Sequence, residues 1–264
     1  MSKYSKILER IFFKTYKEGN DCVPFEREDL IRASQELDLD VPKNLGDIIY
    51  SYRYRKTDSA KINATAPESM QWVIRPKGRS KYAFELAKRS NIFPNTNLVT
   101  IKIPEATPEI ISNAARSDEQ ALLAKVRYNR LIDIFLGLTS YSLQNHLRTT
   151  VPQIGQVEVD EVYVAVDQYG RHYVVPVEAK GHGDELGIVQ TEQDLAVCAD
   201  KWSEYVPVAV GVQFLADDTI AMFELIMQDG EVRVVKERHY QLVPGDQITE
   251  RDRDLYSRLA LGEE

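Results

Sequence analysis

The 264-residue sequence lacks an uninterrupted apolar run of about 18 residues, the minimum expected of a membrane-spanning helix. Its first residues, MSKYSKILERIFFKTYKEGN, contain neither an apolar core nor a small-residue cleavage site, so no signal peptide is expected. Only two cysteines occur, Cys22 and Cys198, and their wide separation favours two reduced thiols over a disulfide. We therefore expect a soluble cytoplasmic protein with no membrane partner.

Several signatures of catalytic and cofactor sites are also missing. The sequence contains no GxxxxGK[ST] loop, no HExxH or CxxC metal spacing and no nucleophile elbow. An ATP-driven motor or helicase is therefore not expected. The four histidines form no visible ligand set, although His182 follows Lys180 closely enough to line the same site.

The composition is that of an ordinary globular protein, with 43% hydrophobic and 28% charged residues. The net charge of −8 hides an asymmetry between the two parts of the chain. Residues 1–100 carry 18 Lys and Arg against 13 Asp and Glu, whereas residues 101–264 carry 15 against 28. A basic part suits a polyanion and an acidic part suits cations, so we expect two domains, 1–102 and 103–264.

The N-terminal part has the pattern of three helices followed by a hairpin. Helices are expected at about 5–16 and 26–37, and a third follows the N-cap candidate Asn44, with Leu45, Ile48, Ile49 and Tyr52 on its buried face. Strands at 71–75 and 81–86 flank a turn with the sequence PKGRS. This order predicts a winged helix-turn-helix domain.

Basic side chains lie where such a domain contacts double-stranded DNA. They would bind phosphates, and the arginines among them could also read guanine edges. The candidates at the end of the third helix are Arg53, Arg55 and Lys56, and those of the wing are Arg75, Lys77, Arg79 and Lys81.

The C-terminal part predicts an α/β fold, in which helices cover a central mixed β-sheet. Ser117 and Gln120 form a capping box for a helix that runs to about Leu136, after a linker and short helix at 103–116. The further elements are expected as strands at 156–166 and 172–180, a helix at 188–203, a strand at 207–215, a hairpin at 219–238 and a helix at 248–260.

The turn at 167–171 sets the register of the two strands that it joins. It pairs Val166 with His172, and counting inward places Asp160 opposite Glu178 and Glu158 opposite Lys180, all on one face. Three carboxylates and one ammonium group so close together call for a counter-charge such as a divalent cation. A bulge at Pro176 would instead slip the register and replace Asp160 by Glu161.

Asp160 followed by Glu178-Ala179-Lys180 at the end of the next strand resembles the PD-(D/E)xK nuclease motif, and the flanking elements over about 110–216 resemble the αβββαβ core of that superfamily. Val159 stands where the named motif has proline. The resemblance implies that Asp160 and Glu178 ligate Mg²⁺ and that Lys180 orients or activates the attacking water. It further implies accessory roles for an acidic residue on the first core helix (Glu119 or Asp118) and for Gln190 or Gln193; Glu158 is an additional candidate by position.

We therefore expect a Mg²⁺-dependent, site-specific endonuclease of double-stranded DNA, resembling a type II restriction enzyme. Such enzymes often act as homodimers, and a cognate DNA methyltransferase is a possible partner. The alternative is a non-catalytic DNA-binding regulator, whose nuclease-like domain only dimerises or binds a ligand. A glycosidase with Asp160 and Glu178 as acid and base explains neither Lys180 nor the basic N-terminal part.

Overall fold

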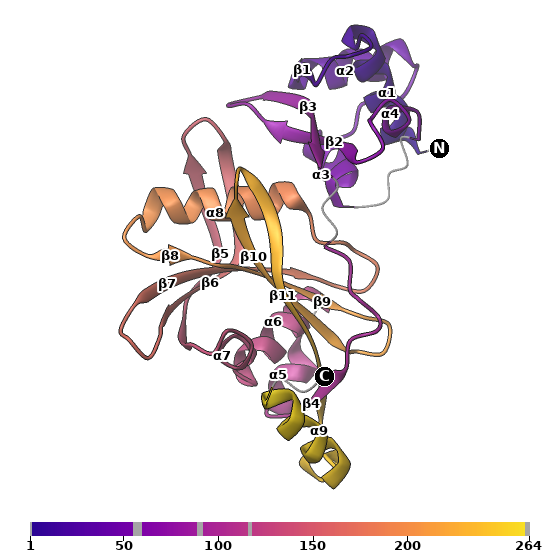
Figure 1. Ribbon diagram of the computed structural model, residues 1–264. Helices are drawn as coiled ribbons and strands as arrows, with labels where there is room; N and C mark the ends of the chain where they lie inside the picture. Colours follow the sequence, from indigo (N-terminus) through magenta and orange to yellow (C-terminus); the bar gives the residue numbers. More distant parts are fainter. Residues whose placement is uncertain (1, 55–59, 89–91, 116–117, 262–264) are drawn as a thin grey trace. The chain divides into compact units, whose positions relative to one another are not determined.

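The computed structural model describes residues 2–54, 60–88, 92–115 and 118–261 (Figure 1). The chain forms two compact units. The first consists of Met1–Asn91, Arg148–Val157 and Gly187–Gln193, and the second of Ile92–Leu147, Glu158–Leu186 and Asp194–Glu264. Three elements, β5, β6 and α8, contribute residues to both units.

The N-terminal segment of the first unit contains helices and a small sheet. In chain order its elements are α1 (Lys3–Thr15), β1 (Cys22–Glu26), α2 (Arg27–Glu36), α3 (Gly46–Tyr54), α4 (Ala60–Asn63), β2 (Met70–Pro76) and β3 (Lys81–Lys88). The sheet has the order β1-β3-β2, with both pairings antiparallel. The three helices and the hairpin of our prediction are present, whereas β1 was not anticipated.

The third helix forms where its cap and its apolar spacing predict it. Asn44 Oδ1 accepts the backbone N–H of Gly46 at 3.0 Å, which satisfies one of the free donors at the helix start. Leu45, Ile48 and Ile49 are buried, and they join a core that includes Phe12 of α1 and Phe84 of β3. Packing of this apolar face, rather than intrinsic helix propensity, holds the short helix.

The second unit is built on an eight-stranded mixed sheet. Its main path has the order β4-β11-β10-β9-β7-β6-β5, and β8 pairs with β7. The strands are β4 (Thr100–Pro104), β5 (Thr139–Val151), β6 (Gly155–Val166), β7 (His172–Lys180), β8 (Val206–Pro207), β9 (Ala209–Phe214), β10 (Ile220–Gln228) and β11 (Glu231–Val243). The helices are α5 (Glu109–Ala114), α6 (Asp118–Tyr128), α7 (Leu131–Leu136), α8 (Ile188–Lys201), η1 (Gly245–Gln247) and α9 (Glu250–Ala260).

Helices lie on both faces of this sheet (Figure 1). Leu122 and Val126 of α6 and Phe135 of α7 pack on one face in a core cluster that includes Val177 of β7. The other face is covered by α8, whose Leu195 is buried. The predicted fold class is thus confirmed at the level of an α/β protein with a large mixed sheet flanked by helices.

One prediction about the segment before β6 is wrong, and one strand there was not predicted. The single helix expected to end near Leu136 breaks into α6 and α7, because Arg130 adopts a left-handed conformation with φ of 51°. The buried amide of Asn129 stabilises the break, since it donates to the Lys125 carbonyl at 2.9 Å and accepts the Ala106 N–H at 2.7 Å. The unassigned stretch after α7 is a long strand, β5. Ser117 of the expected capping box lies outside the described residues.

Other expectations concern the domain boundary, the thiols and the membrane. The expected boundary after residue 102 falls inside β4, which pairs with β11 in the sheet of the second unit. Cys22 and Cys198 are both free thiols. Within the described part of the chain, no helix has the length and apolar character needed to cross a membrane.

Candidate active site

The pairing of β6 with β7 has the register that the turn length predicts. Val166 pairs with His172, and the ladder continues without a shift to Glu161 opposite Val177. Pro176 lies opposite Val162 within this regular ladder, so the alternative with a bulge is wrong. One residue further, Asp160 Oδ2 accepts the Ala179 N–H at 3.0 Å, which holds its carboxylate beside Glu178.

Glu178 and Lys180 form a buried ion pair on the same face of β7. Their side chains are 10% and 4% exposed, and Lys180 Nζ donates to Glu178 Oε1 at 2.5 Å. Burial, followed by the neighbouring Asp160 carboxylate, raises the pKa of Glu178 to about 8, although Lys180 opposes this shift. One ammonium group therefore does not fully compensate the carboxylates beside it.

A third carboxylate reaches this cluster from α6. Burial raises the pKa of Glu119; Lys180 opposes this shift, whereas Asp160 and Asp184 add to it. Glu119, in the first turn of α6, is thus coupled electrostatically to Asp160 of β6 and Lys180 of β7. The structure thus brings together Asp160, Glu178, Lys180 and the accessory candidate Glu119.

Two residues of β9 that sequence analysis did not single out lie beside the cluster on the neighbouring strand. Gly211 lies opposite Glu178 in the parallel register, and Leu186 packs so closely there that a Cβ on Gly211 would approach its Cδ1 to 2.6 Å. Gln213 lies opposite Lys180, and its amide donates to the Asp184 carbonyl at 2.7 Å. A polar residue within the apolar run PVAVGVQFL was the signal that could have identified Gln213.

The donor chemistry of this cluster suits a hard divalent cation. The carboxylates of Asp160, Glu178 and Glu119 supply oxygen ligands, and they outnumber the single ammonium group of Lys180. In addition, Gln213 Oε1 is buried without a hydrogen-bond partner in the described chain. Across the same described residues, no three His, Cys, Asp or Glu side chains form a ready-made ligand group. The fit therefore rests on the oxygen donors and the uncompensated charge.

Asp118 belongs to a neighbouring contact at the start of α6. His182 Nδ1 lies 3.2 Å from Asp118 Oδ2, and its Nε2 lies 3.3 Å from Asp218 Oδ1. The imidazole also stacks on Phe214, with ring centroids 5.1 Å apart. His182 therefore links the beginning of α6 to the turn between β9 and β10, beside the carboxylate cluster.

The opposite face of β6 carries a separate buried carboxylate. Glu161 is fully buried and accepts hydrogen bonds from Arg127 Nε at 2.9 Å and from Ser142 Oγ at 2.7 Å. Its position on the α6 side of the sheet follows from the alternation of side chains along the strand. We assign Glu161 a structural role, because the ion pair with Arg127 compensates its charge.

The remaining accessory candidates lie on β6 and α8. Glu158 is exposed, and its carboxylate lies 3.8 Å from His146 Nδ1. Gln190 and Gln193 lie on α8, where Gln190 is half-buried and Gln193 is 8% exposed. Among the described residues, the side chain of Gln193 makes no hydrogen bond to Asp160 or Glu178.

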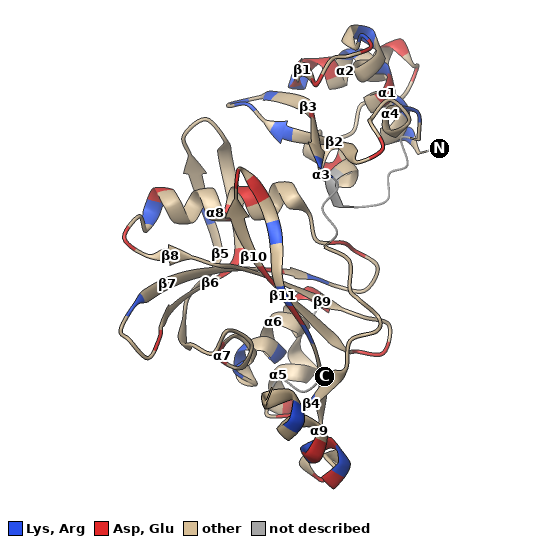
Figure 2. Cartoon of the chain, viewed as in Figure 1, with Lys and Arg blue, Asp and Glu red and all other residues tan. Residues whose placement is uncertain are grey.

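The basic candidates of the first unit have different surroundings. Arg75 forms a bidentate pair with Glu192, at 2.8 and 2.7 Å, and Lys77 Nζ lies 2.5 Å from Glu85 Oε1. Arg79 and Lys81, at the tip of the β2–β3 hairpin, are exposed and have no carboxylate partner among the described residues (Figure 2). Arg53 belongs to α3, and Arg55 and Lys56 lie outside the described residues.

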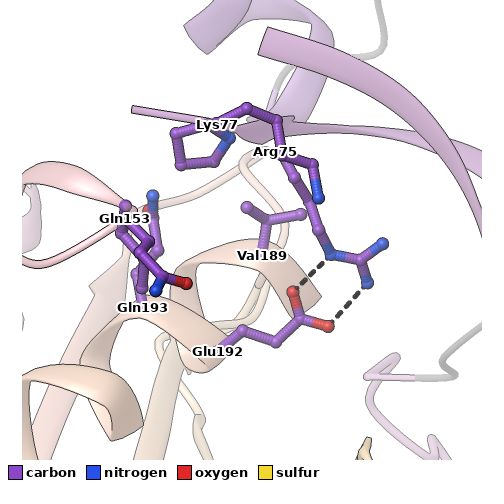
Figure 3. Close-up of a pocket in the computed structure, with 8 residues that line it drawn as sticks. Arg75, Lys77, Gln153, Val189, Glu192 and Gln193 are labelled. Carbon is purple, nitrogen blue, oxygen red and sulfur yellow. Dashed lines mark hydrogen bonds and ion pairs between the residues drawn. The ribbon is translucent and has the colours of Figure 1, made fainter. Parts of the chain in front are cut away.

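The pair of Arg75 with Glu192 borders a cavity of about 490 Å³ within the first unit (Figure 3). Sequence analysis did not reveal this cavity, because the two residues that form the ion pair are 117 positions apart. Gln193, an accessory candidate, also lines it.

Comparisons with known proteins add no family to this description, since no family model, no curated protein and no solved structure matches the chain.

Proposed function

We propose that the chain is a Mg²⁺-dependent endonuclease that hydrolyses phosphodiester bonds of double-stranded DNA at specific sites, as type II restriction enzymes do. The observation that carries this proposal is the convergence of Asp160, Glu178 and Lys180 on one face, beside the end of the ladder between β6 and β7. These residue types are those of the PD-(D/E)xK motif. A carboxylate cluster can also hold the cation of a metal-assisted hydrolysis, and a lysine beside it can stabilise developing negative charge.

Each residue of the cluster has a defined part in this proposal. Asp160 and Glu178 would hold Mg²⁺, with Glu119 as an accessory ligand. When bound, Mg²⁺ supplies charge stabilisation at the phosphoryl oxygens and lowers the pKa of a coordinated water. Lys180 would orient the attacking water and neutralise the negative charge that develops near it. Asp160 is itself oriented by the Ala179 N–H, which restricts where its free oxygen points.

The order of elements supports a core like that of restriction endonucleases. The helical segment α6–α7 is followed by three strands, β5, β6 and β7, and then by α8 and β9. This is the αβββαβ order that the motif implies, with the unexpected strand β5 in the first strand position.

The first unit supports the proposal of a winged-helix DNA-binding module. Its order α1, β1, α2, α3, α4, β2, β3 and its sheet order β1-β3-β2 suit such a module. In this reading α3, which carries Arg53, is the recognition helix and the β2–β3 hairpin is the wing. Arg79 and Lys81 are available for phosphates at its tip, whereas Arg75 and Lys77 are paired with carboxylates.

A homodimer is the assembly that we propose, because one active site cuts one strand and two related sites cut a duplex. The strand β5 lies at one end of the sheet order, and its side chains Tyr141 and Leu143 are 61% and 49% exposed. Edge strands with exposed apolar side chains are suited to pairing with a second copy. A site-specific nuclease also calls for protection of host DNA, so a DNA methyltransferase with the same site is the proposed second partner.

Cleavage of unmethylated plasmid and phage DNA, with Mg²⁺ or with EDTA, tests the proposed activity. We expect discrete fragments in Mg²⁺ only, from the wild type and from Asp229→Asn, which removes an exposed carboxylate outside the cluster. Asp160→Asn and Lys180→Ala should retain DNA binding but lose cleavage.

A smear instead of discrete fragments would indicate a nuclease without site specificity. Binding of DNA without cleavage by the wild type would contradict the enzyme proposal and favour a regulator. Equal loss of DNA binding in Lys180→Ala and in a variant with neutral Arg79 and Lys81 would contradict the separation of catalysis from recognition.

A further inference from the structure

The cavity of the first unit has walls of mixed polarity (Figure 3). Its volume of about 490 Å³ lies within the roughly 300–1,000 Å³ that is usual for small-molecule pockets. Val189 and Ile154 contribute apolar surface, and Gln153 and Gln193 contribute amides. In Figure 3 the two glutamines lie near each other, and Val189 lies between them and Arg75.

The amides of these glutamines are not used by the protein itself. Gln193 is 8% exposed, yet its side chain makes no hydrogen bond within the described part of the chain, whereas Gln153, which also makes none, is exposed to solvent. Buried polar groups in proteins are normally hydrogen-bonded, so the free amide of the buried Gln193 at the wall of the cavity points to a ligand. Each amide offers a donor and an acceptor side by side.

The charges around the cavity argue against an anionic ligand. Arg75 is held by Glu192 in a bidentate pair and also lies 3.4 Å from Glu85, and Lys77 pairs with Glu85 as well. Each cation that lines the cavity is therefore already neutralised by a carboxylate. A phosphate would have to displace these partners, whereas a neutral ligand would not.

We propose that this cavity binds a nucleobase, with the Gln193 amide, assisted by Gln153, hydrogen-bonded to its polar edge and with Val189 and Ile154 against its ring faces. Glutamine amides match the adjacent donor and acceptor of a base such as adenine. Pockets that receive extruded bases combine such hydrogen bonds with apolar contacts to the ring. The base comes either from the DNA duplex or from a free nucleoside. The first source rests on the proposed function, because it requires a DNA-binding protein.

Two arms distinguish these sources, and both use the full chain carrying Asp160→Asn so that DNA stays intact. In the first arm, duplexes in which 2-aminopurine replaces single bases report unstacking as increased fluorescence. In the second arm, saturation-transfer NMR detects binding of each of the four deoxynucleosides. Gln193→Leu and Gln193→Glu change the amide, and Gln247→Leu is the control for an exposed glutamine elsewhere.

An increase in 2-aminopurine fluorescence that is lost in both Gln193 variants, but not in Gln247→Leu, assigns the base to DNA. Binding of a deoxynucleoside with the same dependence, without the fluorescence increase, assigns a free nucleoside. In either case the Gln193 variants should weaken binding on the order of 10-fold. Because Gln193→Glu introduces a carboxyl group at a buried position, an unchanged far-UV circular dichroism spectrum and urea midpoint are required of each Gln193 variant before its binding is compared.

The proposal is overturned if both arms are negative, or if the Gln193 variants behave as Gln247→Leu does. Its failure differs from failure of the nuclease proposal. If both arms are negative while the otherwise wild-type chain cuts DNA in Mg²⁺, the nuclease proposal stands and the pocket proposal falls. Nucleoside binding that depends on Gln193, in a chain that cuts no DNA, would leave the pocket and remove the nuclease.

Discussion

Replacing Glu178 by glutamine should change how the stability of the protein depends on pH. Because the folded-state pKa of Glu178 is raised from 4.5 to about 8, folding favours its protonated form. Its contribution to stability is therefore fully present below the unfolded-state pKa, is lost as the pH rises towards 8, and is constant above that. At about 1.36 kcal/mol for each pH unit, the loss is on the order of 3–5 kcal/mol.

Urea denaturation between pH 4 and pH 9, in EDTA, measures this effect as a difference between proteins. The free energy of unfolding of the wild type should decline more steeply with pH than that of Glu178→Gln. The double variant Glu178→Gln/Lys180→Met removes the lysine that would otherwise be left without its buried partner. Glu204→Gln, at an exposed carboxylate, should follow the wild type.

Parallel curves for the wild type and both Glu178 variants would refute the reasoning that burial and Asp160 destabilise the ionised carboxylate. A cation that binds this site should relieve the same repulsion. Mg²⁺ at about 100 times its dissociation constant would add ~2.7 kcal/mol to the wild type and much less to Glu178→Gln.

Three further variants test other parts of the structure. Asp252→Ala removes a capping box and an ion pair with Lys102, so it should lower Tm and increase hydrogen exchange in α9. The pKa of Asp252 is lowered to about 2, so the stability that this carboxylate contributes above about pH 4 is lost as the pH falls towards 2. Neutralising Arg79 and Lys81 should weaken DNA binding uniformly across sequences and reduce the salt slope by about 2, measured by fluorescence anisotropy at several salt concentrations. Asn129→Ala leaves the Ala106 N–H without its acceptor, so urea denaturation should show a loss of roughly 1–3 kcal/mol; an unchanged midpoint would contradict its role at the break between α6 and α7.

Local sequence signals predicted the elements and the pairing that make the candidate site. The turn at 167–171 correctly predicted the partners from Val166 with His172 to Glu161 with Val177, because the length of the connecting loop sets the register of an antiparallel pair. The apolar spacing after Asn44 likewise predicted α3 and its buried face. Both signals involve residues close in the chain, so they could be read without the fold.

The errors arose where contacts between distant residues decide. The strand β5 has mostly exposed side chains and little apolar alternation, so its sequence TSYSLQNHLRTTV gave no strand signal. The break between α6 and α7 depends on bonds from Asn129 to Ala106 and to Thr107, which the periodicity of a helix does not encode. The strand β1 forms because β3 is there to pair with it.

The sequence by itself determined which carboxylates and which lysine share a face, since alternation and turn length are properties of neighbouring residues. Only the tertiary structure decided the environment of that face. It brought Glu119 to the cluster from α6, placed Gln213 opposite Lys180, and neutralised Arg75 with a carboxylate 117 positions away. The physical reason is that burial and charge compensation depend on packing between segments that are distant in the chain. The same packing decides which side chains find a hydrogen-bond partner.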